Sequence, residues 1–233
     1  MEFIFNLGLN IACPDDFFCG ISLRTAKDMK YGQENLNRLA LFKELKLNPK
    51  KVYGLNQIHS RKVLVVDSGN PPMTEADGMI TNDKSIALSV TAADCLPVIL
   101  LDTASGAVGI VHSGWKGTGI VIDALNLMKT TYNTNPRAVT AILGPCIGSC
   151  CYKVDKERAS FFEKEFGQKS VRKENKNFYL DLKAANVKLL QDIGVQKISI
   201  YKECTCCDER FGSFRREGEG FTRMMALVGW REG

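Results

Sequence analysis

The chain has 233 residues, and its 31 Lys and Arg residues exceed its 26 Asp and Glu residues, which gives a formal net charge of +5. Hydrophobic residues make up 45% and charged residues 24% of the chain. These proportions are typical of a globular protein and exclude a disordered chain, a collagen-like chain and a small disulfide scaffold. The basic excess is small and scattered, so nucleic acid is not an expected partner.

The first half of the chain predicts one helix followed by several strands. Apolar residues recur at helical spacing over residues 33–46, and this predicted helix ends before Asn48-Pro49. Apolar, β-rich runs separated by turn residues predict strands over 52–58, 63–66, 86–90, 98–101 and 108–111, the last two as a hairpin. The longest apolar stretch, residues 86–101, contains Asp94 and Pro97 and is shorter than the roughly 20 residues of a membrane-spanning helix. No membrane segment is therefore expected.

The second half predicts helices and strands in alternation. A helix is marked by Val121, Ala124, Leu125 and Met128. A strand over 138–143, helices over 156–166 and 182–193, and a strand over 197–201 follow. This order is typical of a mixed α/β or α+β domain and does not match a regular βαβ winding. Because no repeat or flexible linker interrupts it, we expect a single domain over residues 1–233.

The only two histidines and one cysteine lie at the ends of expected strands. They are His59, Cys95 and His112. Two imidazoles and one thiolate are good ligands for Zn²⁺, and three protein ligands leave the open fourth position of a catalytic zinc site. Such a zinc would lower the pKa of a bound water to about 7. A second interpretation makes Cys95 a nucleophile and His112 its base, without a metal.

Two further segments favour anions. Residues 113–119 are glycine-rich, join an expected strand to an expected helix, and contain Lys116. Free N–H groups at a helix start and a lysine suit a phosphate, although a tight turn explains the same residues. Arg215 and Arg216 follow Phe211 and Phe214, and arginine binds phosphate through paired contacts; a solvated loop is the alternative.

Nine cysteines form an odd and large set. The chain begins Met1-Glu2 without a basic stretch, which argues against a signal peptide and favours a cytoplasmic location, where thiols are mostly reduced. The clusters Cys146/Cys150/Cys151 and Cys204/Cys206/Cys207 do not form the pair of C-x2-C motifs of a structural zinc site. We expect unpaired thiols there, with a metal or redox role as the alternative.

Several motifs occur together in a fixed order. They are Gln57-Ile58-His59, Glu75-Ala76-Asp77-Gly78, Ala93-Asp94-Cys95-Leu96-Pro97-Val98, His112-Ser113-Gly114-Trp115-Lys116-Gly117, Leu143-Gly144-Pro145-Cys146-Ile147-Gly148, Cys204-Thr205 and Ser213-Phe214-Arg215-Arg216. This set resembles the laccase-domain family, whose members are also called multicopper polyphenol oxidoreductases and purine nucleoside phosphorylases. The resemblance runs from about residue 37 to the C-terminus.

The resemblance implies a fold, a metal and an activity. It implies a four-layer α/β/β/α sandwich of mixed β-sheets flanked by helices, with a zinc held by His59, Cys95 and His112 and copper as the alternative metal. Members are assigned phosphorolysis of adenosine, inosine, guanosine and methylthioadenosine, together with adenosine deamination. Others are described as copper-dependent phenol oxidases or as editing factors in cell-wall synthesis. The spacing of Cys95 and His112 is also similar to that of cysteine deamidases.

We therefore expect a zinc-dependent purine nucleoside phosphorylase that also deaminates adenosine, a monomer or small homo-oligomer with nucleosides and phosphate as its partners. Cys95 and His112 would be catalytic, and Asp94 would orient a ligand, transfer a proton or cap a turn. Phosphate would be oriented by Lys116, Arg215 and Arg216, and a metal-activated water would attack the purine C6 in deamination.

Three alternatives stay open. They are a copper-dependent polyphenol oxidase, a metal-free cysteine hydrolase or amidase in cell-wall precursor editing, and a metal-binding or redox-sensing protein that uses the cysteine clusters. Two histidines cannot supply the many imidazoles of a multicopper centre. The sequence departs from the family pattern at Ala92, Ser113, Lys116 and the Phe221-Thr222-Arg223 tail, which bears on substrate preference.

Overall fold

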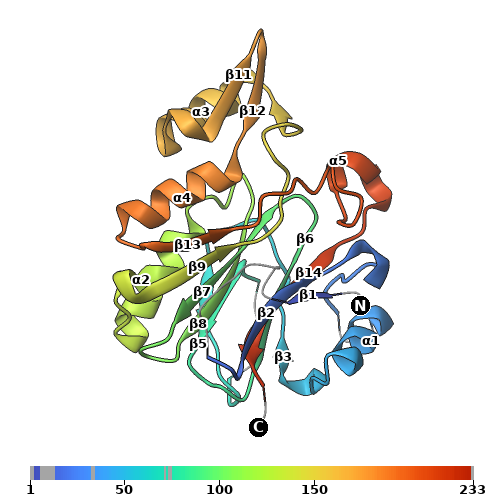
Figure 1. The fold of residues 1–233 in the computed structure, drawn as a ribbon, viewed down its shortest axis with the longest axis vertical. Helices are drawn as coiled ribbons and strands as arrows, with labels where there is room; N and C mark the ends of the chain where they lie inside the picture. The colour runs from blue at the N-terminus through green and yellow to red at the C-terminus, as the bar shows by residue number, and fades with distance from the viewer. Residues whose placement is uncertain (1–2, 6–13, 33–34, 71, 73–74, 232–233) are drawn as a thin grey trace.

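The computed structural model describes residues 3–5, 14–32, 35–70, 72 and 75–231. Two large mixed sheets form its centre (Figure 1). One has the order β1 (Phe3–Phe5), β2 (Phe17–Ser22), β14 (Met224–Trp230), β6 (Ala87–Ala92) and β3 (Val52–Tyr53). The other has the order β13 (Lys197–Ile200), β9 (Val139–Leu143), β7 (Leu96–Asp102), β8 (Val108–Ser113), β5 (Gly78–Thr81) and β4 (Val63–Val65).

Helices cover the outer faces of these sheets. On the six-stranded sheet lie α2 (Ile120–Tyr132) and α4 (Leu182–Asp192), and on the five-stranded sheet lies α1 (Leu36–Glu44). The short α5 (Phe214–Glu217) precedes β14. This arrangement confirms the expected four-layer α/β/β/α sandwich. None of the helices in the described part of the chain is long and apolar enough to cross a membrane.

The two faces of each central strand belong to different cores. In β7, Val98 and Leu100 pack toward the helices, while Ile99 and Leu101 pack between the sheets. Side chains alternate across a strand, so a strand buried on both faces is a continuous apolar run. All seven residues of β7 are buried, and the inter-sheet core therefore holds the site-bearing strands rigidly in place.

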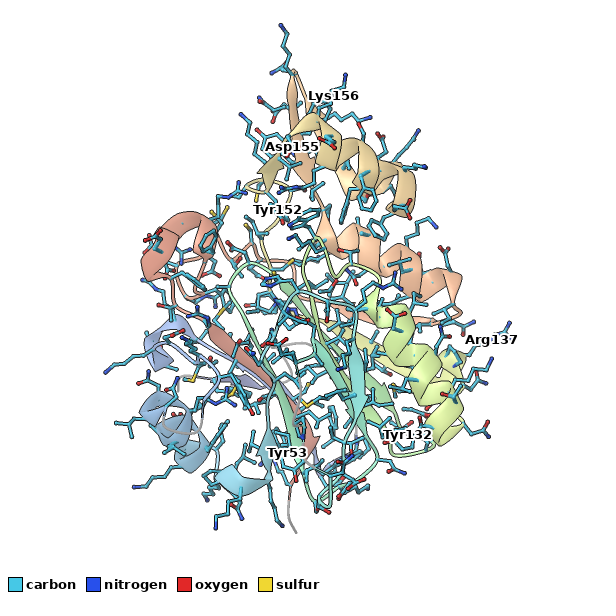
Figure 2. All side chains as sticks on the ribbon, turned by 180° about the vertical axis from the view of Figure 1, so that it is seen from behind. Tyr53, Tyr132, Arg137, Tyr152, Asp155 and Lys156 are labelled. Carbon is cyan, nitrogen blue, oxygen red and sulfur yellow. The ribbon has the colours of Figure 1, made fainter. Side chains whose placement is uncertain are left out.

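A smaller unit extends beyond the large sheets. It comprises β10 (Lys153–Val154), β12 (Asn177–Leu180), β11 (Val171–Glu174) and α3 (Lys156–Phe166). It lies at the top of Figure 1, with Tyr152 at its base and Asp155 and Lys156 further out in the view from behind (Figure 2). Phe162 and Leu180 join it to the main core.

Most of the expected elements are present with shifted ends. The expected hairpin over 98–101 and 108–111 is confirmed as the antiparallel pair β7 and β8. The helices over 156–166 and 182–193 correspond to α3 and α4, and the helix over 33–46 corresponds to α1, with residues 33–34 outside the described residues. Seven strands observed among the described residues were not expected, namely β1, β2, β5, β10, β11, β12 and β14.

The strand expected over 52–58 is wrong beyond Tyr53. The chain leaves the sheet at Gly54, and the side chain of Gln57 then takes over the pairing with β6. Its Nε2 donates to the Thr91 carbonyl at 2.8 Å, and its Oε1 accepts from the Thr91 N–H at 2.7 Å. This departure from the sheet brings His59 toward the ends of the other strands.

Candidate active site

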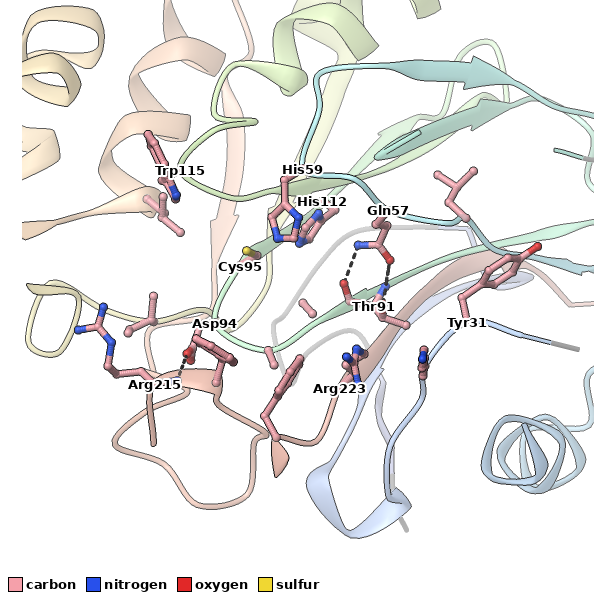
Figure 3. A pocket seen from close by; sticks show the side chains of 18 of the residues that line it. Tyr31, Gln57, His59, Thr91, Asp94, Cys95, His112, Trp115, Arg215 and Arg223 are labelled. Carbon is pink, nitrogen blue, oxygen red and sulfur yellow. Dashed lines mark hydrogen bonds between the residues drawn. The ribbon is translucent and has the colours of Figure 1, made fainter. Parts of the chain in front are cut away.

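A cavity of about 620 Å³ opens where loops from both large sheets meet. His59, Cys95 and His112 point toward one another at its wall (Figure 3). Aromatic residues and cations line much of the remainder, and the described lining includes Lys30, Tyr31, Trp115, Tyr152, Arg158, Phe214, Arg215, Phe221 and Arg223. The volume and the mixture of apolar walls with a few polar groups are typical of a small-molecule site.

The two histidines and the cysteine form one compact cluster. A ligating atom from each of the three lies within 4.8 Å of the others, and the two imidazole rings are 4.9 Å apart at an angle of 72°. Cys95 immediately precedes β7, and His112 lies near the end of β8. His59 is exposed, whereas His112 is buried. The sequence prediction of these three residues as a group agrees with this geometry.

The backbone at Gly114 lies so close to Cys95 and His59 that it leaves no room for a side chain. An added Cβ at Gly114 would lie 2.9 Å from Cys95 Sγ and 3.3 Å from His59 Cδ2. His59 itself has a φ of 60° and Asp94 a φ of 87°, in the left-handed region that side chains disfavour. Such backbone persists only where the surroundings fix it.

Asp77 fixes the loop that carries His59. Its carboxylate accepts from the backbone N–H groups of His59 at 2.9 Å and Ser60 at 2.6 Å, and from the Ser60 hydroxyl at 2.7 Å. It also lies 2.9 Å from Nδ1 of His112. A carboxylate on one ring nitrogen fixes the orientation of the imidazole and leaves the other nitrogen for a ligand. Asp77 thus positions both histidines.

The pKa values follow from these contacts. Burial alone would raise the pKa of Asp77, but hydrogen bonds from His112 and Ser60 lower it to about 2. Burial alone would raise the pKa of Cys95, but the charges of and hydrogen bonds to His112 and His59 lower it to about 6. Burial alone would lower the pKa of His112, but the Cys95 thiolate and Asp77 raise it to about 9. At neutral pH the cluster holds a thiolate and an imidazolium.

This donor set fits a borderline-soft divalent cation. Two imidazoles and a thiolate are the ligand types that zinc prefers, and an exposed His59 leaves an open side toward the cavity. The Cys95 thiolate is already in the ligating form at neutral pH, whereas the protonated His112 would release a proton when the ion binds.

Two of the other expected site residues, Asp94 and Arg215, line the same cavity. The buried Asp94 accepts from the Arg215 backbone N–H at 2.7 Å (Figure 3). It also accepts from Thr205 Oγ1 at 2.7 Å. Its carboxylate therefore fixes the start of α5. The guanidinium of Arg215 reaches the cavity but donates to the carbonyls of Cys151 and Lys153.

Lys116 and Arg216 are absent from the cavity lining formed by the described residues. Lys116 is exposed, with Nζ 5.6 Å from the Trp115 ring centre. Arg216 donates to the carbonyls of Thr205 at 2.7 Å and Cys206 at 3.1 Å, and so holds a loop together.

Sequence reasoning missed Arg158 and gave Asp77 no role beyond a motif. Arg158 comes from α3, and its guanidinium carbon lies 4.2 Å from the Trp115 ring centre. No local signal around Arg158 points to a site, because only tertiary contacts bring α3 to Trp115. Asp77 lies between two expected strands and within the motif Glu75-Ala76-Asp77-Gly78, and this position could have indicated a role in the site.

Comparisons with known proteins identify the family. Residues 21–231 match the family described as multi-copper polyphenol oxidoreductase laccase, and the chain belongs to this family. It is 32% identical over 201 residues to a protein of Aquifex aeolicus named purine nucleoside phosphorylase, covering 82% of this chain and 92% of that protein. It is also 32% identical over 209 residues to the mouse purine nucleoside phosphorylase LACC1, covering 86% of this chain. The chain spans about half of that relative, 48% of its length.

Solved structures agree with the fold. The crystal structure of the Bacillus licheniformis hypothetical protein YfiH superposes with a TM-score of 0.86 at 26% identity, over 93% of this chain and 94% of that one. YlmD from Geobacillus stearothermophilus superposes with a TM-score of 0.85 at 26% identity, over 94% and 93% of the two chains.

Proposed function

We propose that this protein is a zinc-dependent purine nucleoside phosphorylase. This proposal rests on one observation: the cluster of His59, Cys95 and His112 lies in the wall of a cavity lined by aromatic rings and arginines. The names of the Aquifex and mouse relatives support the same reaction. His59, Cys95 and His112 would hold the zinc, which would supply Lewis-acid polarisation of a substrate oxygen.

The cavity residues suit the two substrates. Tyr152 and Trp115 offer aromatic surface for a purine, and aromatic rings stack readily on nucleobases. Burial raises the pKa of Tyr152, so its hydroxyl keeps its proton as a hydrogen-bond donor. Arg158 lies 3.9 Å from the Asp155 carboxylate, beyond normal hydrogen-bond length, so its donors are available to phosphate.

Phosphorolysis would proceed by displacement at the sugar. A phosphate oxygen bonds to C1′ of the ribose while the bond from C1′ to the purine nitrogen breaks. The purine leaves with the electron pair and takes up a proton, and ribose 1-phosphate is the second product. Arg158 and Arg215 would hold the phosphate near C1′, where fixed orientation lowers the barrier.

The expected substrates are adenosine, inosine, guanosine and methylthioadenosine, and we also propose deamination of adenosine. In deamination, water adds at C6 and the 6-amino group leaves as ammonia, which yields inosine. Asp94, which lines the cavity, would serve both reactions by fixing the backbone of Arg215.

One alternative is favoured by a specific observation. Cys95 with a pKa of about 6 beside a protonated His112 is also a competent nucleophile for a metal-free cysteine hydrolase. This alternative predicts activity that survives chelators and is lost on alkylation of Cys95. A copper phenol oxidase, by contrast, predicts oxygen consumption with phenols.

A chromatographic product assay tests the proposal. The purified protein is incubated with adenosine, with and without phosphate, beside a Cys95→Ala variant. Adenine and ribose 1-phosphate are expected only with phosphate, and inosine in either buffer; both activities should be lost in Cys95→Ala. Cys206→Ala, a half-buried cysteine outside the cavity lining, is the matched control and should retain activity. A folded, zinc-loaded protein that turns over no nucleoside contradicts the proposal.

A further inference from the structure

A second group of metal-ligating side chains lies outside the active-site cluster. The Sγ atoms of Cys150, Cys151, Cys204 and Cys207 all lie within 4.8 Å of one another. The first two follow β9 and the last two follow β13, so two loops more than fifty residues apart converge there. Neither cysteine cluster of the sequence supplies four thiols for a metal ion by itself. The fold brings together two cysteines from each cluster.

The sulfur separations match a tetrahedral ion. Cys207 Sγ lies 3.6 Å from Cys150 Sγ and 3.3 Å from Cys151 Sγ. Four sulfurs bound to zinc at about 2.3 Å are separated by about 3.8 Å at the corners of a tetrahedron. Both observed separations are shorter than that value, by about 0.2 and 0.5 Å, so an ion requires only small outward adjustments of these side chains.

The backbone around Cys204 is arranged for a thiolate. The N–H of Gly148 donates to Cys204 Sγ at 3.1 Å, and the N–H of Cys207 closes the turn by donating to the Cys204 carbonyl at 3.1 Å. Cys204 and Cys207 are separated by two residues, the C-x2-C spacing found in many structural zinc sites. Backbone donors directed at a ligating sulfur are the outer contacts that such sites use to orient their ligands.

Hydrophobic burial does not account for the cluster. Cys150 and Cys207 are exposed, so their thiols gain little from contact with one another. A divalent ion with four thiolates carries a net charge of −2, and three cations from α4 and α5 contact carbonyls of the two loops. Arg215 donates to the Cys151 carbonyl, Arg216 to that of Cys206, and Lys183 to that of Glu203. Arg216 is already paired with Glu217, so Arg215 and Lys183 are the charges that would offset the negative charge of the ion and its ligands.

We propose that Cys150, Cys151, Cys204 and Cys207 form a second metal site, a closed tetrathiolate site for Zn²⁺ that is separate from the His59, Cys95 and His112 cluster. The ion would tie the loop after β9 to the loop after β13. Ile147 and Tyr152, on the first loop, line the cavity. The site would therefore stabilise one wall of the cavity without contacting the substrate.

Cobalt binding tests this proposal independently of any activity. A His59→Ala/Cys95→Ala variant removes the active-site cluster, and its reduced, chelator-treated protein is titrated with Co²⁺ in the absence of oxygen. We expect one equivalent to bind with an intense thiolate-to-cobalt charge-transfer band and the visible bands of tetrahedral cobalt. One equivalent of Zn²⁺ should then remove both.

Two further variants in the same background locate the ion. Cys150→Ser/Cys207→Ser changes exposed residues, so the fold should persist by circular dichroism while the cobalt bands disappear. Cys206→Ser, in the same loop but outside the four, should keep them. The proposal is overturned if cobalt shows no thiolate band, if Cys150→Ser/Cys207→Ser keeps it, or if the isolated protein is two hydrogens lighter because a disulfide joins two of the four.

Discussion

At the scale of single residues, Asp77 holds the site together. It accepts from the backbone of the His59 loop and from the ring of His112, and it is fully buried. We predict that Asp77→Asn weakens zinc binding by about 10- to 100-fold, because one amide cannot accept all of these bonds and the imidazoles lose their orientation. Asp83→Asn is the control, since Asp83 accepts backbone N–H groups of Ser68 and Ser85 outside the cavity lining. Competition with a fluorescent chelator gives both affinities, and equal affinities would contradict this role.

The thiol of Cys95 gives a pH-dependent prediction. In metal-free protein its pKa of about 6 means that the thiolate forms as pH rises from 5 to 7, while His112, with a pKa of about 9, stays protonated. Iodoacetamide modification of Cys95 should therefore increase with a midpoint near pH 6, read by peptide mass spectrometry. Cys146, whose pKa burial raises to about 12, should stay unmodified at pH 7. A midpoint near 8.5, the value of an ordinary cysteine, would show that the two histidines do not stabilise the thiolate.

Arg158 and Lys116 offer a direct comparison of two candidate phosphate ligands. Both lie beside Trp115, but Arg158 lines the cavity whereas Lys116 is exposed and outside its lining. We predict that Arg158→Ala raises the KM for phosphate about tenfold, the effect of losing one charge-assisted hydrogen bond, with a smaller change for the nucleoside. Lys116→Ala should change the phosphate KM less than threefold. The reverse order would move the phosphate site to the glycine-rich turn.

At the scale of elements, the sequence predicts strands best where periodicity and turns agree. The β7 and β8 hairpin and helices α3 and α4 were correctly predicted because each has a clear apolar pattern between turn residues or caps. The strand β14 was missed although all seven of its residues are buried. Its apolar run Met224–Trp230 was a usable local signal, but its pairing with β2 and β6, from distant parts of the chain, was not predictable from local sequence.

Helix α4 begins at a cap that also contacts the cysteine loop. The Asp181 carboxylate accepts from the Ala184 N–H at 2.8 Å and from the Ser149 hydroxyl at 3.3 Å. We predict that Asp181→Ala destabilises the protein by about 1 kcal/mol in urea unfolding, the usual cost of losing an N-terminal cap. Asp181→Asn keeps an acceptor oxygen, so its free energy of unfolding should fall by only a few tenths of a kcal/mol. Equal losses for both variants would show that charge, not the cap, stabilises the helix start.

At the scale of the whole molecule, the site is where separate layers meet. His59, Cys95 and His112 could be predicted because histidine is rare here and each lies at the end of an apolar run. Arg158 could not be predicted as a site residue, because α3 reaches Trp115 only through the smaller unit that β10, β11 and β12 form. The four clustered thiols were missed for the same reason: each loop contributes two.

Because each metal ligand set joins distant segments, metal removal should affect the whole fold. His59 follows β3 of the five-stranded sheet, whereas Cys95 immediately precedes β7 and His112 lies in β8, both strands of the six-stranded sheet. An ion present at about 1,000 times its Kd stabilises the native state by about 4 kcal/mol. For a chain of this size, each kcal/mol shifts the Tm by about 2–4 °C, so chelation should lower the Tm by about 10 °C for one site.

Variants separate the two contributions to that shift. His59→Ala/Cys95→Ala should keep the part that arises from the four thiols, and Cys150→Ser/Cys207→Ser should keep the part that arises from the active-site cluster. With both pairs replaced, chelation should leave the Tm unchanged, because no ligand set remains to link folding to metal. A wild-type protein whose Tm is insensitive to chelator and to added Zn²⁺ would contradict metal binding at both places, since an ion that binds only the folded chain must stabilise it.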